Sequence, residues 1–378
     1  MLVPLVVAAP PPPIVRAASI QDSPIAVTIT PRSGTKRLTC GVDFARAKPC
    51  TRNAKFKISP GRHTVFVYAI DKRGHKSASR TVTVVVPRPA PPAIRVGAEP
   101  VGIAATDGAI WVSNSSAGTV SKIDTAGRRV VATVQVGGQL GGIATSNDGS
   151  TVWVSDYGGG SVVRIDAAKA TVVQRIAVGG HPTSLIPHFL GPLWVGNLDG
   201  YVTRVDPATG ISTRLTLPSG VSVLFGAQVL IWAGLQDGSV VAIDPATGAV
   251  TGAAVAVAPD VDAITTDSMN RLWVSTFAGT AALVDPDARK VKLRVKLPSR
   301  GSGISADGGG SCVWASAYDS GLVVQLDAAT GALLGAVHTG AGPRESIAVG
   351  NTLWVVNQTD GTVMPITIGS GAFLGCVR

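Results

Sequence analysis

Tryptophan occurs seven times in this 378-residue chain, each time at the same place in a repeat of 38 to 42 residues. Every one of these tryptophans has aliphatic residues on both sides, as expected of a buried strand. One such sheet cannot bury both of its faces alone, so neighbouring repeats must stack. The repeat therefore predicts seven similar four-stranded sheets in a ring, a β-propeller, with each indole buried between neighbours: Trp111, Trp153, Trp194, Trp232, Trp273, Trp314 and Trp354.

An aspartate follows the tryptophan by twelve or thirteen residues in six of the seven repeats. The residues after it favour a hairpin turn, as in Asp206-Pro207 followed by Gly210. In such a turn the carboxylate accepts backbone N–H groups, proline presets the first turn residue, and glycine takes the left-handed position. We therefore predict turn chemistry and not a metal site for Asp124, Asp166, Asp206, Asp244, Asp285 and Asp327.

The expected ring occupies residues 93–378. Two segments compete to complete its last sheet. Residues 93–98 align with the outer strands of other repeats, and so do residues 372–378. The sequence leaves both alternatives open.

Residues 22–87 form a second expected domain, because short alternating strands there are separated by turns such as Pro60-Gly61. We expect a small β-sandwich, followed by a proline-rich linker at 88–92. Residues 1–21 are expected to be disordered, either as a clipped secretory signal or as a proline-rich leader. No apolar run is long enough to predict a membrane span.

Charge is unevenly divided along the chain. Residues 22–97 hold 15 Lys and Arg against three Asp, whereas residues 98–378 hold 17 Lys and Arg against 20 acids. The two regions therefore carry net charges of +12 and −3. A basic module of this kind either binds polyanions, such as wall polymers, acidic lipids or nucleic acid, or is simply a solvated cationic domain. No feature points to sequence-specific nucleic-acid recognition.

The four cysteines show no metal-binding spacing. Two disulfides in an exported protein are the simplest arrangement, with Cys40–Cys50 inside the small domain and Cys312–Cys376 between the last two repeats. Four free thiols in a cytosolic protein are the alternative. We expect a secreted or cell-surface monomer without a bound metal or cofactor.

Two family resemblances refine this interpretation. The small domain resembles bacterial Ig-like repeats through Cys40, Cys50, the Gly-Arg-His at 61–63 and the Val-Tyr-Ala-Ile-Asp at 67–71. This likeness implies an extracellular spacer or adhesion module. The ring resembles the YVTN/YncE-like propellers through Trp-Val-Ser-Asn at 111–114, Val-Ser-Lys-Ile-Asp at 120–124 and the strand at 130–137. That likeness implies a secreted binding or surface-scaffold protein.

A propeller binds ligands at one mouth of its central channel. The ligand-binding residues expected there are Glu99, Gln139, Asp156, Tyr157 and Tyr318. If the site is catalytic, an ionisable base, carboxylates and a cation must converge on its loops. The catalytic candidates are accordingly His181, Asp262, Arg344 and Glu345.

The competing interpretation is an enzyme. The repeats are similar to those of the streptogramin (virginiamycin B) lyases, which implies a Mg²⁺-assisted ring-opening elimination using His and Glu. Those enzymes have repeats like Trp-Phe-Thr-Glu, whereas Trp is followed here by Val-Ser-Asn, Val-Ser-Asp or Val-Gly-Asn. The lyase hypothesis expects His181 to converge with Glu345 or Asp262. The preferred hypothesis is a non-catalytic protein that binds an unidentified protein, glycan or wall polymer.

Overall fold

The computed structural model describes residues 9–187, 191–227, 229–307 and 309–368. Its regular elements are all β-strands. The chain divides into two compact units, Met1–Arg88 with Leu334–Val337, and Pro89–Leu333 with His338–Arg378. No helix in the described ranges is long and apolar enough to cross a membrane.

The first unit contains two antiparallel sheets that share one core. The three-stranded sheet has the order β1-β2-β5 and the four-stranded sheet the order β4-β3-β6-β7. Alternate residues of both sheets point inward, such as Ile25 and Val27 from one and Val65 and Val67 from the other. The strands are β1 (Ile14–Arg16), β2 (Ile25–Thr30), β3 (Arg37–Val42), β4 (Lys48–Cys50), β5 (Asn53–Phe56), β6 (Gly61–Ile70) and β7 (Arg80–Val86).

The expectation of disorder up to residue 21 is wrong for the described part of that segment. Strand β1 pairs with β2 between Ile14 and Thr30, and Ile20 forms a parallel bridge with Val85. The segment is ordered because Val15 and Ala17 pack against the shared core. The proline-rich start hides this short apolar alternation from sequence analysis.

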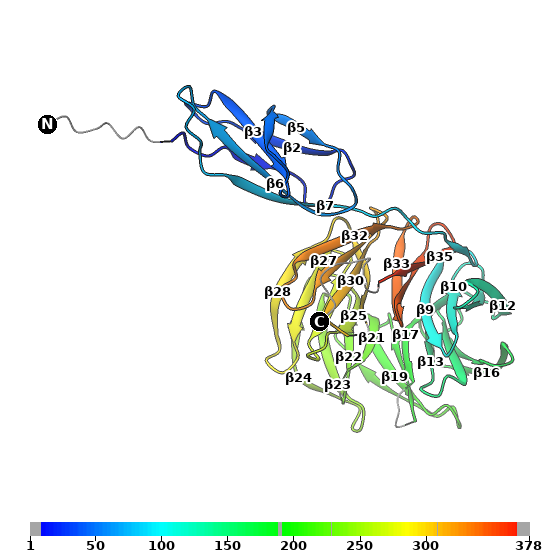
Figure 1. Ribbon diagram of the computed structural model, residues 1–378. Helices are drawn as coiled ribbons and strands as arrows, with labels where there is room; N and C mark the ends of the chain where they lie inside the picture. Colours follow the sequence, from blue (N-terminus) through cyan, green and yellow to red (C-terminus); the bar gives the residue numbers. More distant parts are fainter. Residues whose placement is uncertain (1–8, 188–190, 228, 308, 369–378) are drawn as a thin grey trace. The chain divides into compact units, whose positions relative to one another are not determined.

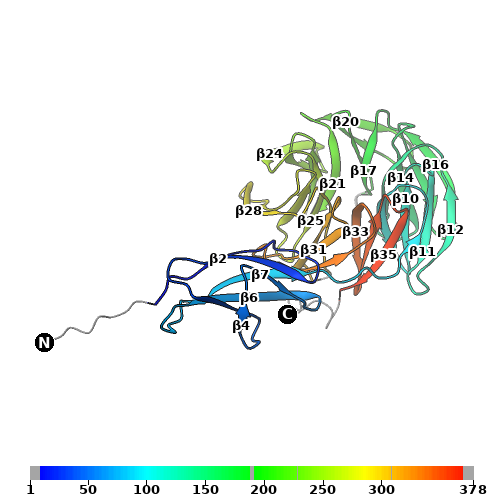
Figure 2. The same cartoon turned by 90° about the horizontal axis from the view of Figure 1, so that it is seen from above.

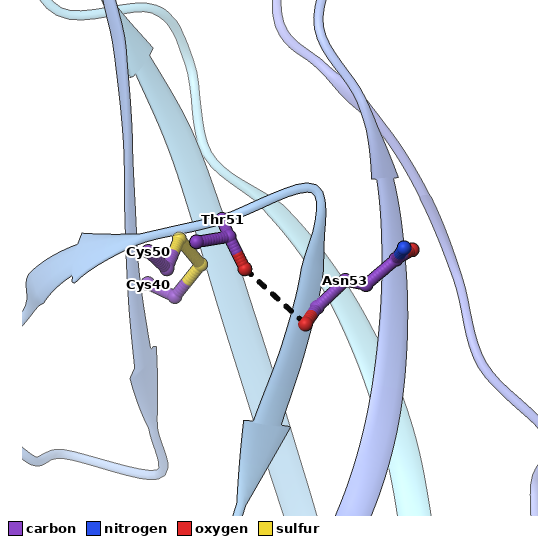
Figure 3. The surroundings of a disulfide bond; sticks show 4 residues. All are labelled: Cys40, Cys50, Thr51 and Asn53. Carbon is purple, nitrogen blue, oxygen red and sulfur yellow. Dashed lines mark hydrogen bonds between the residues drawn. A yellow bond between two sulfur atoms is a disulfide. The ribbon is translucent and has the colours of Figure 1, made fainter.

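The expected Cys40–Cys50 disulfide is present and joins β3 to β4 (Figure 3). Just beyond it, the Thr51 hydroxyl donates to the Asn53 carbonyl oxygen over 3.2 Å. Cys40 is buried in the core of the unit. The other expected pair involves Cys376, which lies outside the described residues.

Within the described residues, seven further four-stranded antiparallel sheets follow the first unit along the chain; we call them the ring and number them in chain order. Sheets one to three are β9 (Pro100–Thr106), β10 (Ala109–Asn114), β11 (Thr119–Asp124), β12 (Arg129–Gln135); β13 (Leu140–Thr145), β14 (Thr151–Asp156), β15 (Ser161–Asp166), β16 (Thr171–Ala177); and β17 (Pro182–Pro187), β18 (Leu193–Asn197), β19 (Tyr201–Val205), β20 (Ser212–Thr216).

Sheets four to six are β21 (Val221–Ala227), β22 (Leu230–Leu235), β23 (Ser239–Asp244), β24 (Ala249–Ala256); β25 (Val261–Thr266), β26 (Leu272–Thr276), β27 (Thr280–Asp285), β28 (Lys290–Lys296); and β29 (Gly301–Ala306), β30 (Cys312–Ala317), β31 (Leu322–Asp327), β32 (Leu333–His338). The seventh is β33 (Pro343–Val349), β34 (Thr352–Asn357), β35 (Thr362–Thr367) and β8 (Ile94–Arg95).

The first strands of these sheets form a closed cycle, since each contacts the next and β33 contacts β9. Figures 1 and 2 show the sheets following one another from cyan to red, with the red strands beside the cyan ones. All seven tryptophans are buried on the second strands, as predicted. Trp111 packs against Val152 and Val154 of the next sheet, and Trp354 packs against the first sheet.

The ring is closed by the segment at 93–98. Ile94 and Arg95 of β8 pair with Val363 and Thr362 of β35, so a strand from before the first sheet completes the last one. The Val96 amide also donates to the Gly361 carbonyl oxygen over 3.0 Å. The competing segment, 372–378, lies outside the described residues.

The predicted turn role of the recurring aspartates is confirmed. The Asp206 carboxylate accepts the amides of Ala208 and Thr209, and each of the others accepts an amide two or three residues on. These backbone hydrogen bonds lower the pKa of Asp206 and of Asp244.

Candidate functional site

One backbone hydrogen bond recurs in every ring sheet and defines the end that we call the mouth. The residue shortly before the first strand accepts an amide from a residue just past the second strand, as in Ser115 N–H to Glu99 C=O at 2.8 Å. The bond brings two loops of each sheet to one edge. The accepting residues are Glu99, Gln139, His181, Gly220, Asp260, Arg300 and Gly342.

A cavity of about 330 Å³ opens at the mouth. Its walls come from every ring sheet except the sixth. The carboxyl and guanidinium side chains that line it are Glu99, Asp260, Asp262, Arg344 and Glu345, and the side-chain amides are Gln139, Gln236 and Gln358. Ligand cavities of this size, with a few convergent polar groups, are common in binding proteins.

Charge is unevenly distributed over the part of the cavity wall that the first strands form. Asp262 on β25 and the neighbours Arg344 and Glu345 on β33 place charge on sheets five and seven. On the first strands of sheets two to four the corresponding part of the wall is small or apolar: Gly141, Gly142, Thr183, Ser184, Ser222 and Val223. A ligand therefore meets charged side chains on one wall and small, uncharged side chains on the other.

The charged wall is organised around Arg344. One guanidinium nitrogen lies 3.8 Å from a carboxylate oxygen of Asp262, and another donates to the Gln358 side-chain oxygen over 3.3 Å. The Tyr318 hydroxyl donates to the same Gln358 oxygen over 3.0 Å. Arg344 is thus held between a carboxylate and an amide that is itself fixed by a tyrosine.

Burial shifts both carboxylic acids of this wall. It raises the pKa of Glu345 to about 7, with Arg344 opposing and Asp262 reinforcing the rise. Burial likewise raises the pKa of Asp262, again against the pull of Arg344. One Glu345 oxygen accepts the Ile103 amide at 3.3 Å. Glu345 can therefore hold or release a proton near neutral pH.

Gly303 on β29 lets the sixth sheet approach the charged wall closely. A methyl group at this position would overlap the Arg344 carbonyl oxygen and crowd the Glu345 α-carbon. The absence of a side chain here therefore helps to set where Arg344 and Glu345 lie.

Of the four catalytic candidates, the structure brings together Asp262, Arg344 and Glu345. His181 does not line the cavity. Its side chain is half exposed at the rim, with Nδ1 3.1 Å from the Asp199 carboxylate and its ring 5.0 Å from that of Tyr157. The expected convergence of His181 with Glu345 or Asp262 is not seen.

The expected ligand-binding residues divide in the same way. Glu99, Gln139 and Tyr157 line the cavity, and Tyr318 contributes indirectly through Gln358. Asp156 faces away from it. Its carboxylate is buried and forms a 2.5 Å ion pair with Arg175 on the outer strand β16.

The residues that end the second strands do not line the cavity. Asn114, Asn197 and Asn357 end their second strands and are buried, and their side-chain amides donate to Thr119, to the Gly179 carbonyl oxygen and to Thr362 respectively. Successive residues of a strand point to opposite sides, so the next residue is the one that faces the cavity. The missed lining residues Ser115, Leu198, Phe277 and Gln358 all lie four positions after the tryptophan, which is the signal that would have found them.

Rim residues five positions after a tryptophan were also missed. Each of them contacts a mouth residue of its own sheet through its side chain. The pairs are Ser116 with Glu99, Asp199 with His181 and Asp319 with Arg300. The two basic rim side chains are therefore already paired with carboxylates. In the described residues, no group of three His, Cys, Asp or Glu side chains is placed to hold a metal ion.

Comparison with known proteins supports the fold. No family model and no curated protein sequence matches the chain. The similar solved structures include hydrazine synthase of Kuenenia stuttgartiensis (17% identity, TM-score 0.64, 71% of this chain and 95% of that one), virginiamycin B lyase from Staphylococcus aureus (17%, 0.62, 72% and 95%) and a streptogramin B lyase (14%, 0.64, 74% and 97%). At these identities the likeness shows a β-propeller fold, and activity needs separate evidence.

Proposed function

We propose that this chain is an exported binding protein in which an Ig-like sandwich precedes a seven-bladed β-propeller, and that the propeller captures a small polar molecule at its mouth without transforming it. Seven ring sheets closed by β8 support the number of blades. The two-sheet sandwich with its Cys40–Cys50 bridge supports the Ig-like assignment and export, because disulfides persist mainly outside the cytosol.

The observation that carries this proposal is the cavity with its prearranged polar groups. Arg344, Gln358 and Tyr318 hold one another in place before any ligand arrives. Preorganisation of this kind lowers the entropic cost of binding. The rim ion pairs of His181 and Arg300 leave those side chains occupied, which favours recognition over acid–base chemistry.

The test is a thermal-shift and calorimetric screen of small polar molecules against the wild type and a cavity-filling variant, Ser222→Trp. Ser222 is a half-buried residue of the cavity wall. Ser212→Trp is the matched control, because Ser212 is exposed on the outer strand β20. We expect ligands that bind the wild type and the control but not Ser222→Trp. Equal binding to all three proteins would place the site elsewhere.

The first unit is proposed to contact a polyanionic surface or polymer. All three of its acidic residues are engaged by partners within the protein, including Asp43 with His63 and Asp71 with His75. The excess of Lys and Arg over acidic residues in this unit can therefore attract an external polyanion.

A streptogramin-lyase-like activity is the second candidate, and Glu345 is the observation that favours it. A buried carboxyl group with a pKa near 7 is suited to general acid or base catalysis. Two lyases also share the fold. Against it, His181 lies at the rim, and the described residues offer no three-ligand group for Mg²⁺.

Mass spectrometry of virginiamycin B incubated with the protein, with and without Mg²⁺, tests this candidate. The binding proposal expects no linear product. Turnover that is lost in Glu345→Gln would replace the binding proposal with the lyase.

A further inference from the structure

We propose that the mouth cavity is selective for a small organic cation, one that carries an ammonium or guanidinium group on an apolar body. This inference rests on the proposed function and names the class of ligand. It starts from the lining of the cavity, which holds four carboxyl groups and one guanidinium.

The acidic excess persists after internal pairing is taken into account. Arg344 is shared between Asp262 and Gln358, so it balances one carboxylate of the wall. Glu99, Asp260 and Glu345 have no basic side chain among the cavity residues left to pair with. The two basic residues at the rim, His181 and Arg300, are held by Asp199 and Asp319. A cation entering the mouth therefore meets uncompensated negative charge.

Two acidic residues are held in the mouth at some conformational cost. Glu99 and Asp260 have φ values of 50° and 57°, in the left-handed region. The residue in the same place on the seventh sheet is Gly342, with φ 68°. Glycine takes this conformation without penalty, whereas a side chain there costs about 1 kcal/mol. Glu99 and Asp260 thus occupy positions that glycine takes without penalty, and both line the cavity.

The remainder of the lining suits the body of an organic cation. Tyr157 and Phe277 bring aromatic rings to the cavity, and rings attract ammonium and guanidinium groups through their faces. On the opposite wall Ser222 presents a small side chain, and Gly141 and Gly142 present none. An anion is disfavoured, because the one guanidinium it would use is already engaged by Asp262.

The experiment uses pairs of probes that share a shape but not a charge. Choline is compared with its neutral carbon analogue 3,3-dimethylbutan-1-ol, and butylguanidine with its neutral analogue butylurea, by calorimetry on the full chain at pH 8. We expect the cation of each pair to bind at least about tenfold more tightly, as favourable partly buried charge pairs allow. We also expect the difference to shrink with added salt.

Two conservative variants locate the effect. Asp260→Asn keeps a residue that tolerates the left-handed conformation, and Glu345→Gln keeps shape while removing the charge. Each should weaken choline binding by about three- to tenfold and leave the neutral analogue unchanged. Asp287→Asn, on the turn between β27 and β28, is the matched control and should change neither. Circular dichroism verifies that all variants are folded.

Three outcomes would overturn the inference. If the neutral analogue binds as tightly as the cation and Ser222→Trp abolishes both, the cavity binds ligands without charge selection and the proposed function stands. If the cations bind equally to the wild type and Ser222→Trp, they bind outside the cavity. If no probe binds and the wider screen also finds no ligand that Ser222→Trp abolishes, the proposed function fails as well.

Discussion

The two units of this chain differ in the sign of their net charge and in what stabilises them. The first unit is a small, strongly basic sandwich with a core of two sheets and the Cys40–Cys50 bridge. The ring is slightly acidic overall and draws its stability from indoles packed between successive sheets. Four of its carboxyl groups line the mouth cavity. A small domain buries a smaller fraction of its surface than a large one, so a covalent bridge can add more to its stability, whereas seven stacked sheets bury a continuous core.

Trp111→Ala is expected to give the largest effect and to affect the ring alone. It removes a fully buried indole that packs against the next sheet and donates to the Thr106 hydroxyl. Large-to-small changes of this kind cost about 3–5 kcal/mol of stability. Calorimetry should show the ring transition lowered and the first unit's transition unchanged. A lowered transition for both would mean that the two units unfold together.

Cys40→Ala with Cys50→Ala should act on the first unit alone. Their bridge closes a loop of sequence separation 10. Its loss is expected to lower the stability of that unit by about 3 kcal/mol, because the unfolded chain gains freedom. All seven tryptophans lie in the ring, so their fluorescence transition serves as the internal control and should not move. An unchanged first unit would mean that its core suffices without the bridge.

Glu345→Gln should stabilise the ring at high pH. The folded pKa of Glu345 is about 7 against an ordinary value of 4.5. Between these values the folded state binds more protons than the unfolded state, so the wild type loses stability as pH rises through this window. The variant should equal the wild type near pH 4 and exceed it by about 2–3 kcal/mol at pH 8. Parallel denaturant curves at both pH values would contradict the burial of this carboxyl group.

Neutralising two exposed cations of the first unit should have the smallest effect, and only on polyanion binding. Lys72→Gln with Arg73→Gln, on the β6–β7 loop, should elute from heparin at lower salt, with a salt slope reduced by about two. Lys290→Gln with Lys296→Gln, on β28 of the ring, is the matched control and should elute as the wild type does. If both double variants eluted at equally lowered salt, polyanion binding would not be specific to the first unit.

Most of the charged residues that line the cavity could be predicted from the sequence, and the predictions that failed did so for physical reasons. Glu99, Gln139, Tyr157, Asp262, Arg344 and Glu345 were all predicted and all line the cavity. Asp156 was predicted from its position alone, but its carboxylate turns to Arg175, a partner from another strand that spacing cannot reveal. His181 was chosen for its chemistry, but Asp199, five residues after Trp194, holds it at the rim.

The sequence alone determined the ring, because a buried indole at a fixed repeat position demands one sheet per repeat and a neighbour on each side. It also predicted the recurring turns, and it favoured the Cys40–Cys50 bridge over free thiols in the small domain. Only the tertiary structure decided which segment closes the ring, that β1 belongs to the sandwich, and which of two adjacent residues faces the mouth. Those outcomes depend on hydrogen bonds and burial between residues far apart in the chain, where local pattern carries no information about the partner.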